Sequence, residues 1–470
     1  MDIRAAVYKI LTANILGSLF SFGGLVVFAN KLGAAQMGVF FLFQSVIGLL
    51  GIPVDFGITS AVEKRISEGQ KAPEVLSTGI LIKLVVLLPV SAGLFVSDGL
   101  IYKYVGSDIT SILILGLIAQ QFGQFGLRTL NGEMRVGDTA IIRITQKAIW
   151  ILIGLGLIEF GYDVRAIMYS FVLGWIVAIV WTSYRLSTPV GFPSWPMTKS
   201  LLTYGRYALI GSVGAYLYSW MDVAILGFFV GNSAIGAYEF AWRVAAFVML
   251  FQSAVRTVIF PQISEWNAKG DTSRIEDLLE RALILPLLIA VPALFGGLVL
   301  GRDILVIVFG TSLSAGATVL IIFLIEKIFR SVHLTLSPTL FAMNKPELGY
   351  RGSGGAIVAN LMLNFALIPQ FGVVGAAVAT SLSSIIGAVI SIMYLRRLIS
   401  IRFPTRIIGW ALFSSVLMSI AVFVLREGVK TNTFLSLGLA IAAGVCIYGL
   451  CTVAYAPIRI ELQEIVQALS

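Results

Sequence analysis

Histidine, cysteine and charged residues are all scarce in this chain of 470 residues. The single histidine, His333, excludes histidine-based catalytic triads and histidine-rich metal centres. The two cysteines, Cys446 and Cys451, lie five residues apart in one apolar stretch and form neither a disulfide framework nor a four-ligand zinc site. No GxxxxGK(S/T) phosphate loop occurs. These absences predict that the chain is not an enzyme and that it carries no cofactor.

The chain has few charged residues and many apolar ones in comparison with soluble proteins. Charged residues make up 12% of the chain, about half the usual share in soluble proteins, whereas 58% are hydrophobic and the mean hydropathy is +0.94. The formal net charge is +9, but the basic residues are scattered and form no patch with interleaved aromatics, so nucleic acid is not an expected partner. The composition predicts an integral membrane protein in contact with membrane lipids.

The hydrophobic pattern predicts the membrane-crossing segments. A helix needs about 20 mostly apolar residues to cross the hydrocarbon core. The expected fold is an all-α membrane protein with about 14 transmembrane helices, at 10–29, 38–58, 78–96, 109–127, 144–160, 166–184, 207–230, 237–258, 283–300, 314–334, 354–369, 372–394, 407–425 and 434–456. Most of the 33 Lys and Arg residues fall on the side that holds the N-terminus. Because positive loops stay inside, both termini are expected in the cytoplasm and the protein in the cytoplasmic (inner) membrane.

An internal repeat organises these segments. Gly33 and Gly38 recur as Gly231 and Gly236, an offset of 198 residues, and further matches follow at offsets of 197 and 210. An even number of helices per copy implies two lobes in a V, related by an axis along the membrane normal and suited to alternating access. The expected division is an N-terminal lobe at 1–185, a proline-containing linker at 186–203, a C-terminal lobe at 204–397 and an added helix pair at 398–470.

Several polar residues within the apolar segments are candidate ion ligands. Asp222 lies near the middle of the segment 207–230, where an ionisable side chain is costly unless it faces a cavity or a partner. Asn360 and Asn364 are one helical turn apart, and the next segment brings Thr380 and the backbone near Ala376 beside them. These oxygens suit a hard monovalent cation, and the alternative is hydrogen bonding between helices.

Four stretches of the sequence resemble those of a known family of membrane proteins. "FANKLGAAQMGVFFLFQSV" with "DFGITSAVEKRIS", and "DVAILGFFVGNSAIGAYEFAWRV" with "FPQIS", resemble the multidrug/oligosaccharidyl-lipid/polysaccharide flippase superfamily, in its polysaccharide-transport and O-antigen flippase branch. The resemblance implies a MATE-like fold and a flippase for a lipid-linked oligosaccharide of the polyprenyl pyrophosphate type. Partner enzymes implied are polysaccharide polymerase or glycosyltransferase machinery.

The resemblance also implies a coupling ion. The set Asp222, Asn360, Asn364, Ala376 and Thr380 is similar to the sodium site of lipid II flippases in the same superfamily. Asn364 departs from that pattern, since the family carries an aspartate there. The lost charge leaves proton coupling through Asp222 as the alternative to sodium.

A flippase must also hold the pyrophosphate, and arginine binds phosphate through two parallel hydrogen bonds. Candidate substrate ligands are Arg243, Glu239, Lys327 and Arg256. The alternatives are a Glu239–Arg243 salt bridge, cytoplasmic anchoring by Arg256, and neutralisation of Lys327 by the neighbouring Glu326.

Other functions remain open at this stage. A multidrug efflux antiporter of the same fold is the nearest, but such antiporters commonly carry an acidic residue in the first helix, and 10–29 contains none. A membrane scaffold would not need intramembrane charges such as Asp222 and Arg243. Asp55, near the end of the segment 38–58, is expected to form an ion pair between lobes or at the surface.

Overall fold

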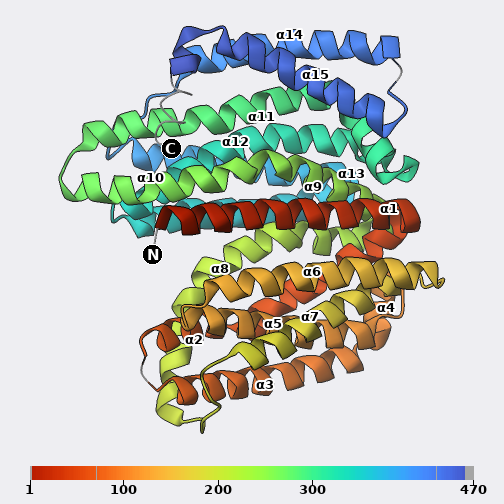
Figure 1. Cartoon of the computed structure of the whole chain (residues 1–470), viewed down its shortest axis with the longest axis vertical. Helices are drawn as coiled ribbons and strands as arrows, with labels where there is room; N and C mark the ends of the chain where they lie inside the picture. Colours follow the sequence, from red (N-terminus) through yellow and green to blue (C-terminus); the bar gives the residue numbers. More distant parts are fainter. Residues whose placement is uncertain (1–2, 70, 430, 461–470) are drawn as a thin grey trace. The chain divides into compact units, whose positions relative to one another are not determined.

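The structure is a computed structural model that describes residues 3–69, 71–429 and 431–460 (Figure 1). Within these ranges, the structure describes the backbone but not the side chains of residues 3–16, 210–212, 215, 251, 253–258, 311–312 and 429. Every regular element in the described ranges is a helix, which confirms the all-α prediction.

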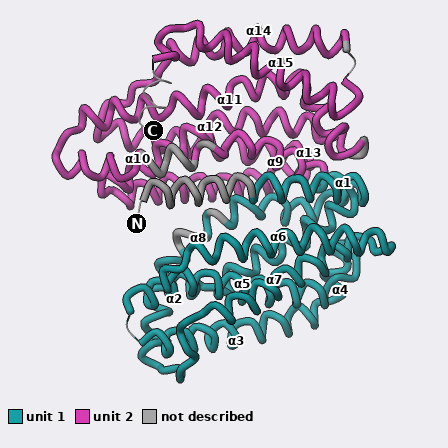
Figure 2. Tube along the Cα trace, in the orientation of Figure 1, with its two compact units in different colours: residues 1–236 teal, residues 237–470 magenta. Residues whose placement is uncertain are grey.

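The chain divides into two compact units, residues 1–236 and 237–470 (Figure 2). The helices that begin in the first unit are α1 (Ile3–Asp55), α2 (Ile58–Ser67), α3 (Ala72–Val96), α4 (Asp98–Val105), α5 (Thr110–Gly132), α6 (Val136–Glu159), α7 (Arg165–Arg185), α8 (Trp195–Phe229) and α9 (Asn232–Ala246). Those that follow are η1 (Phe247–Met249), α10 (Leu250–Ala268), α11 (Thr272–Phe309), η2 (Thr311–Gly316), α12 (Ala317–Ala342), α13 (Pro346–Leu395), α14 (Thr405–Val429) and α15 (Phe434–Val453). The predicted lobe boundaries stay a prediction.

Two long helices each contain two predicted segments. Gly33 interrupts α1 with φ 77°, and Gly372 interrupts α13 with φ 54°. A positive φ is readily adopted only by glycine, so each position lets the chain change direction without a loop. Among the described residues, nine helices are long and apolar enough to cross a membrane, which confirms a multi-pass membrane protein. The count of fourteen spans stays a prediction.

The structure corrects the bounds of three predicted segments. The helix α6 begins at Val136, eight residues before the predicted start at 144. The segment 237–258 is divided by η1, so α9 ends at Ala246 and α10 continues to Ala268. The segment 38–58 ends earlier than predicted, because α1 ends at Asp55 and, after a break at Phe56 and Gly57, α2 runs from Ile58 to Ser67. In each case the polar residues that marked a loop in the sequence are carried on a helix.

A close helix crossing in the first unit repeats at the predicted offset. A Cβ atom on Gly38 would overlap the carbonyl oxygen of Asn232, and one on Gly236 would overlap that of Ala34. Gly38 and Gly236 are 198 residues apart, and so are Ala34 and Asn232. Two copies of one motif therefore cross with each glycine against the backbone of the other, as a two-fold relation requires.

One turn is also repeated, once in each unit. Met134 follows α5 with φ 62°, and Asn344 follows α12 with φ 57°, at an offset of 210 residues. The closing hydrogen bonds correspond as well: Arg135 N donates to Leu130 O at 2.9 Å, and Lys345 N donates to Leu340 O at 2.8 Å. The same helix-turn-helix geometry at the offset found in the sequence supports the duplication.

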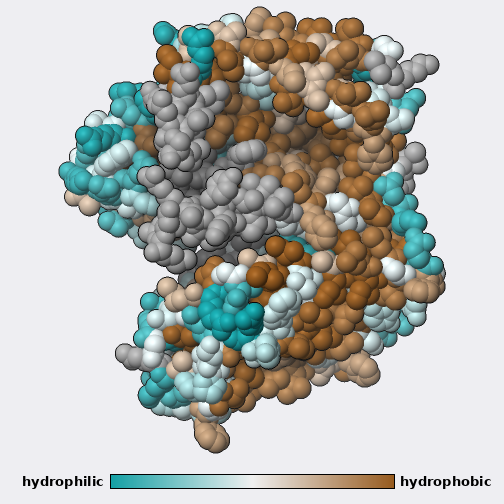
Figure 3. Space-filling model, in the orientation of Figure 1, coloured by the Kyte–Doolittle hydropathy of each residue, from teal (hydrophilic) through white to brown (hydrophobic). Residues whose placement is uncertain are grey.

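Aromatic side chains form much of the first unit's interior. Phe40 stacks on Trp150 with ring centroids 5.8 Å apart, and Phe43 meets Phe171 edge-on at 5.7 Å. On the visible face, hydrophobic side chains cover the middle of the helices and hydrophilic ones gather toward their ends (Figure 3). This distribution is the one expected of helices that lie in a bilayer.

Candidate functional site

Polar side chains on α13 meet across the break at Gly372. Asn360 Nδ2 donates to Thr380 Oγ1 at 3.1 Å, and Asn364 Nδ2 donates to Asn360 Oδ1 at 3.3 Å. All three side chains are buried. Since Asn360 precedes the break and Thr380 follows it, the change of direction at Gly372 is what brings them together.

This cluster contains most of the predicted ion ligands. Ala376 is buried one turn before Thr380, so its backbone lies on the same segment as the hydroxyl. The cluster offers neutral amide, hydroxyl and carbonyl oxygens, which suit a monovalent cation better than a divalent one. Over the described residues, no group of three or more His, Cys, Asp or Glu could hold a metal ion.

Asp222 lies in the first unit, near the C-terminal end of α8. It is buried and precedes the helix end at Phe229 by seven residues, and its depth in the membrane stays a prediction. The helix begins at Trp195, well before the predicted segment 207–230. The cluster on α13 belongs to the second unit, and the membership of Asp222 in one ion site with it stays a prediction.

Glu239 and Arg243 form the predicted salt bridge within α9. Arg243 Nε lies 3.2 Å from Glu239 Oε2, and the carboxylate side chain is 3% exposed while the arginine is 22% exposed. Arg243 lies in the last turn of α9, where the helix dipole favours a cation. Arg243 therefore remains the more accessible of the two as a phosphate ligand.

Lys327 is enclosed on α12. Its Nζ lies 2.6 Å from Glu326 Oε2, and Ser384 Oγ donates to the other carboxylate oxygen at 2.7 Å. The ammonium also lies over the rings of Trp242 and Phe323, at 5.7 and 5.6 Å. These contacts fix Lys327 inside the second unit, so its role as a substrate ligand stays a prediction. Arg256 lies on α10, and its side chain is outside the described residues.

Sequence reasoning missed a buried ion pair in the first unit. Lys83, on α3, is fully buried, and its Nζ lies 2.7 Å from Asp55 Oδ1 and 2.9 Å from Gln121 Oε1. Asp55 therefore pairs inside its own unit. The signal was a lysine within the predicted segment 78–96, since intramembrane charges are rare without a partner.

Asp55 also stabilises a helix break. The chain passes through positive φ at Phe56 and Gly57, between α1 and α2. The same carboxylate oxygen that binds Lys83 accepts hydrogen bonds from the backbone N–H and the hydroxyl of Thr59, in the first turn of α2. A carboxylate at this position satisfies N–H groups that the break leaves exposed and interacts favourably with the helix dipole.

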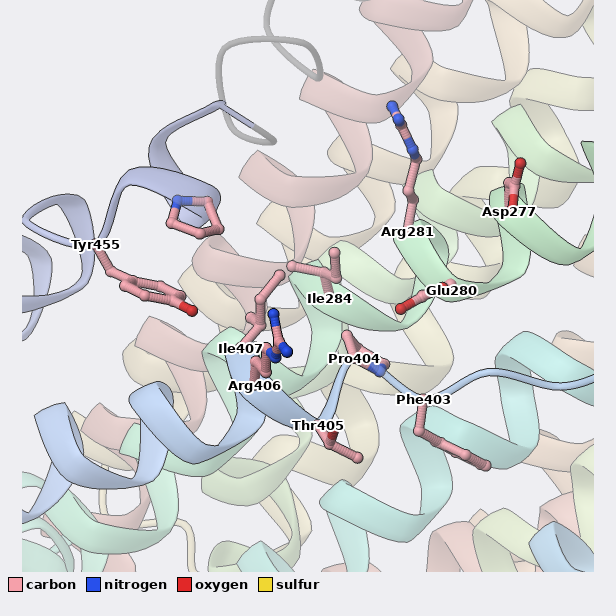
Figure 4. Close-up of a pocket in the computed structure, with 11 residues that line it drawn as sticks. Asp277, Glu280, Arg281, Ile284, Phe403, Pro404, Thr405, Arg406, Ile407 and Tyr455 are labelled. Carbon is pink, nitrogen blue, oxygen red and sulfur yellow. The ribbon is translucent and has the colours of Figure 1, made fainter.

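A pocket of about 640 Å³ lies in the second unit and holds none of the predicted ligands. Figure 4 shows its lining residues coming from α11, from the segment 403–407 and from Tyr455 after α15. Two carboxylates, Asp277 and Glu280, lie with two guanidinium groups, Arg281 and Arg406. The balanced charge favours no ion of one sign, and we assign it no ligand.

Long apolar helices, glycine breaks and buried polar clusters define a multi-pass transporter-type membrane protein. The family model described as "Lipid II flippase MurJ" matches residues 149–452, and the model described as "Polysaccharide biosynthesis protein" matches residues 4–267. The chain belongs to the multidrug/oligosaccharidyl-lipid/polysaccharide flippase superfamily, in its glycan-flippase branch.

Two relatives come from Haloferax volcanii. The "Probable low-salt glycan biosynthesis flippase Agl15" is 41% identical over 98% of this chain and 97% of its own length. The "Probable flippase AglR" is 29% identical over 89% of each chain. The solved structure of a "Lipid II flippase MurJ, inward closed conformation" has a TM-score of 0.79 and 18% identity, covering 96% of this chain and 100% of its own. That likeness shows the fold alone.

Proposed function

We propose that this protein moves a lipid-linked oligosaccharide of the polyprenyl pyrophosphate type from the cytoplasmic to the outer leaflet, for glycan or surface polysaccharide assembly. The family and the relative named as a glycan biosynthesis flippase support this substrate class. The protein acts as a transporter rather than a catalyst, in the cytoplasmic membrane with both termini inside. The translocated oligosaccharide then passes to polymerase or glycosyltransferase machinery.

Alternating access carries the head group while the lipid tail stays in the bilayer. The proposed substrate ligands are Arg243 and Glu239 on α9, with Lys327 and Arg256. Arginine suits the pyrophosphate because its planar fork binds phosphate oxygens in pairs.

The observation that best supports cation coupling is the buried cluster of Asn360, Asn364 and Thr380 at the α13 break. Broken helices in transporters provide irregular backbone that can coordinate an ion. With Asp222 and the backbone at Ala376, this cluster would bind sodium, or Asp222 would carry a proton. Such an ion drives transport only if it binds the two conformations with different affinity.

Reconstitution tests the proposal. Proteoliposomes containing a lipid-linked oligosaccharide are followed for the rate at which the sugar becomes accessible on the opposite leaflet, with and without a sodium gradient. We expect gradient-dependent flipping that Asp222→Ala abolishes and that Glu159→Gln, at an exposed carboxylate, leaves unchanged. Flipping that ignores sodium in both proteins would overturn sodium coupling. Absence of flipping, with efflux of cationic dyes, would instead indicate a multidrug antiporter.

A further inference from the structure

The segment that joins α7 to α8, residues 186–196, presents large apolar side chains to its surroundings; we name it the strap. Val190 is 72% exposed, Phe192 is 93% exposed and Trp195 is 78% exposed. Single exposed apolar residues are ordinary, but three within six residues form a patch. Such a patch is unfavourable in water unless another apolar surface covers it.

The strap lies level with the ends of membrane-crossing helices. It begins where α7 ends, and it contacts the start of α3 and the turn after α5. The helices α3, α5 and α7 have 25, 23 and 21 residues, so at 1.5 Å per residue they are about 31–38 Å long, slightly more than the roughly 30 Å hydrocarbon core. Their ends therefore lie in the head-group region, and so does the strap. Aromatic side chains such as those of Trp and Tyr are enriched at this depth.

Hydrogen bonds fix the strap to the first unit. The Glu133 carboxylate accepts from Ser187 N at 3.0 and 3.1 Å and from Thr188 N at 2.8 Å. Gly191 N donates to Pro73 O at 3.2 Å, where the strap crosses the first turn of α3 (Figure 1). A Cβ atom on Gly191 would lie only 2.9 Å from Pro73, so glycine permits this close approach. The strap thus turns its glycine toward the unit and the neighbouring apolar side chains away from it.

The backbone of the strap is suited to contact with lipid. Three of its residues have no N–H group because they are prolines, namely Pro189, Pro193 and Pro196. Ser194 N donates to Thr78 Oγ1 at 3.3 Å, and the Ser194 hydroxyl caps α8 by accepting from Met197 N at 3.3 Å. An N–H group without a partner is costly away from water, so the prolines and these hydrogen bonds lower the cost of placing the strap against a membrane.

The charge around the strap complements an anionic surface. No Asp or Glu occurs in residues 164–221, whereas Arg185 and Lys199 flank the strap and are both exposed. The carboxylate that holds the strap has a cation of its own, since Glu133 Oε2 lies 3.9 Å from Arg135 Nη1. The two flanking cations therefore add positive charge at the head-group level, where anionic lipid attracts lysine and arginine. Their long side chains can reach the head groups while the apolar stems stay against lipid.

We propose that the strap is a membrane-surface anchor. Val190, Phe192 and Trp195 insert among the head groups of the adjacent leaflet, and anionic lipids of that leaflet bind the flanking cations, Arg185 and Lys199. The partner is thus a negatively charged lipid surface, and the inference does not depend on which substrate the protein transports. Because the strap is hydrogen-bonded to the first unit, the anchor fixes the depth of this unit in the bilayer.

Quenching of a fluorophore on the strap tests the anchor. Phe192→Cys, or Lys269→Cys as a control at a 63% exposed side chain after α10, is introduced into the variant Cys446→Ser/Cys451→Ser and labelled in nanodiscs of phosphatidylcholine and phosphatidylglycerol. We expect lipids spin-labelled near the head group to quench the label at 192, and aqueous iodide to quench it several-fold less than the label at 269. The reverse pattern would overturn the anchor. Protection of the label at 192 from both quenchers would show that protein, such as a second copy of this chain, covers the strap, and would also overturn it.

A measurement without a label covers the case in which the dye itself enters the membrane. Trp195→Phe keeps an apolar ring and removes one indole, so the fluorescence of the wild type minus that of the variant isolates Trp195. We expect brominated lipids to quench this difference signal. A difference signal that only aqueous iodide quenches would overturn the anchor.

Lipid composition tests the charge of the partner. In nanodiscs with phosphatidylglycerol, spin-labelled lipid should quench the label at 192 more strongly than in phosphatidylcholine alone. The variant Arg185→Gln/Lys199→Gln should lose most of this difference, whereas Lys31→Gln, which removes an exposed cation paired with Glu159, should keep it. An equal response to both lipid compositions in the protein with its native cations would overturn the anionic partner.

Discussion

Burial, rather than distance, should decide what the Lys83–Asp55 ion pair contributes to stability. Its nitrogen and oxygen lie 2.7 Å apart, and so do those of the Lys31–Glu159 pair. The first pair has side-chain exposures of 0% and 25%, and the second 49% and 67%. The same protein therefore contains a buried and an exposed pair of equal length, each within the first unit.

Asp55→Ala should be the costly change because it leaves the Lys83 ammonium buried without its carboxylate. Breaking a buried pair in this way typically costs 3–5 kcal/mol. Gln121 Oε1 still accepts from Lys83, and Asp55 is partly exposed, so we expect about 2–3 kcal/mol. Lys83→Met leaves only a carboxylate that is 25% exposed and that Thr59 still binds, and we expect less than about 1.5 kcal/mol.

The assay is unfolding of the reconstituted protein by titration with SDS, which gives relative free energies from the shift of the transition. The double variant Asp55→Ala/Lys83→Met should cost less than Asp55→Ala alone, since the buried cation is then gone, and about 1 kcal/mol more than Lys83→Met, since the hydrogen bonds from Thr59 are lost. Glu159→Ala, at the exposed pair, should change the free energy by less than about 1 kcal/mol. The reasoning is refuted if the two buried single variants cost the same and their effects add.

Three further predictions follow from other contacts. Gly38→Ala should destabilise the first unit by about 1–3 kcal/mol, because the added Cβ atom meets a backbone carbonyl of α9. Gly23→Ala, with open space around it, should leave the stability unchanged. Equal midpoints of SDS unfolding for the two variants would contradict the close crossing. Asn364→Asp should tighten sodium binding about tenfold or more, since one more negative charge contributes on the order of 1–4 kcal/mol at 4 Å. Binding of radioactive sodium measures this change, and an unchanged affinity would count against the ion site. Arg426→Leu should speed hydrogen exchange in α14, because Asp303 on α11, a carboxylate that is only 13% exposed, loses a charge-assisted hydrogen bond of about 1.5–3 kcal/mol. Arg402→Leu, at an exposed pair, should not change the exchange, and equal exchange in both variants would refute this.

The sequence by itself determined the class of protein and the internal duplication. Hydropathy is a local property that adds along the chain, so the apolar segments could be located without knowing what they pack against. The spacing of Gly38 and Gly236 was also readable, because their close crossing demands glycine at both positions. The salt bridge of α9 followed from the helical period alone.

The cluster on α13 was predicted in part. The turn-apart spacing of the two asparagines was visible, and the short connection suggested that Thr380 lies beside them. That the connection is a single glycine break within one continuous helical path, Gly372, depends on its backbone conformation, which the residue type permits but does not impose.

Only the tertiary structure decided which charges are buried, and with what partner. Lys83 and Lys147 both read as cytoplasmic markers in the sequence, because a count of lysines and arginines carries no depth. Their depth depends on where each helix begins, and their partners, Asp55 and Gly17, come from other helices. Contacts between residues far apart in the chain are set by packing, which no local pattern specifies.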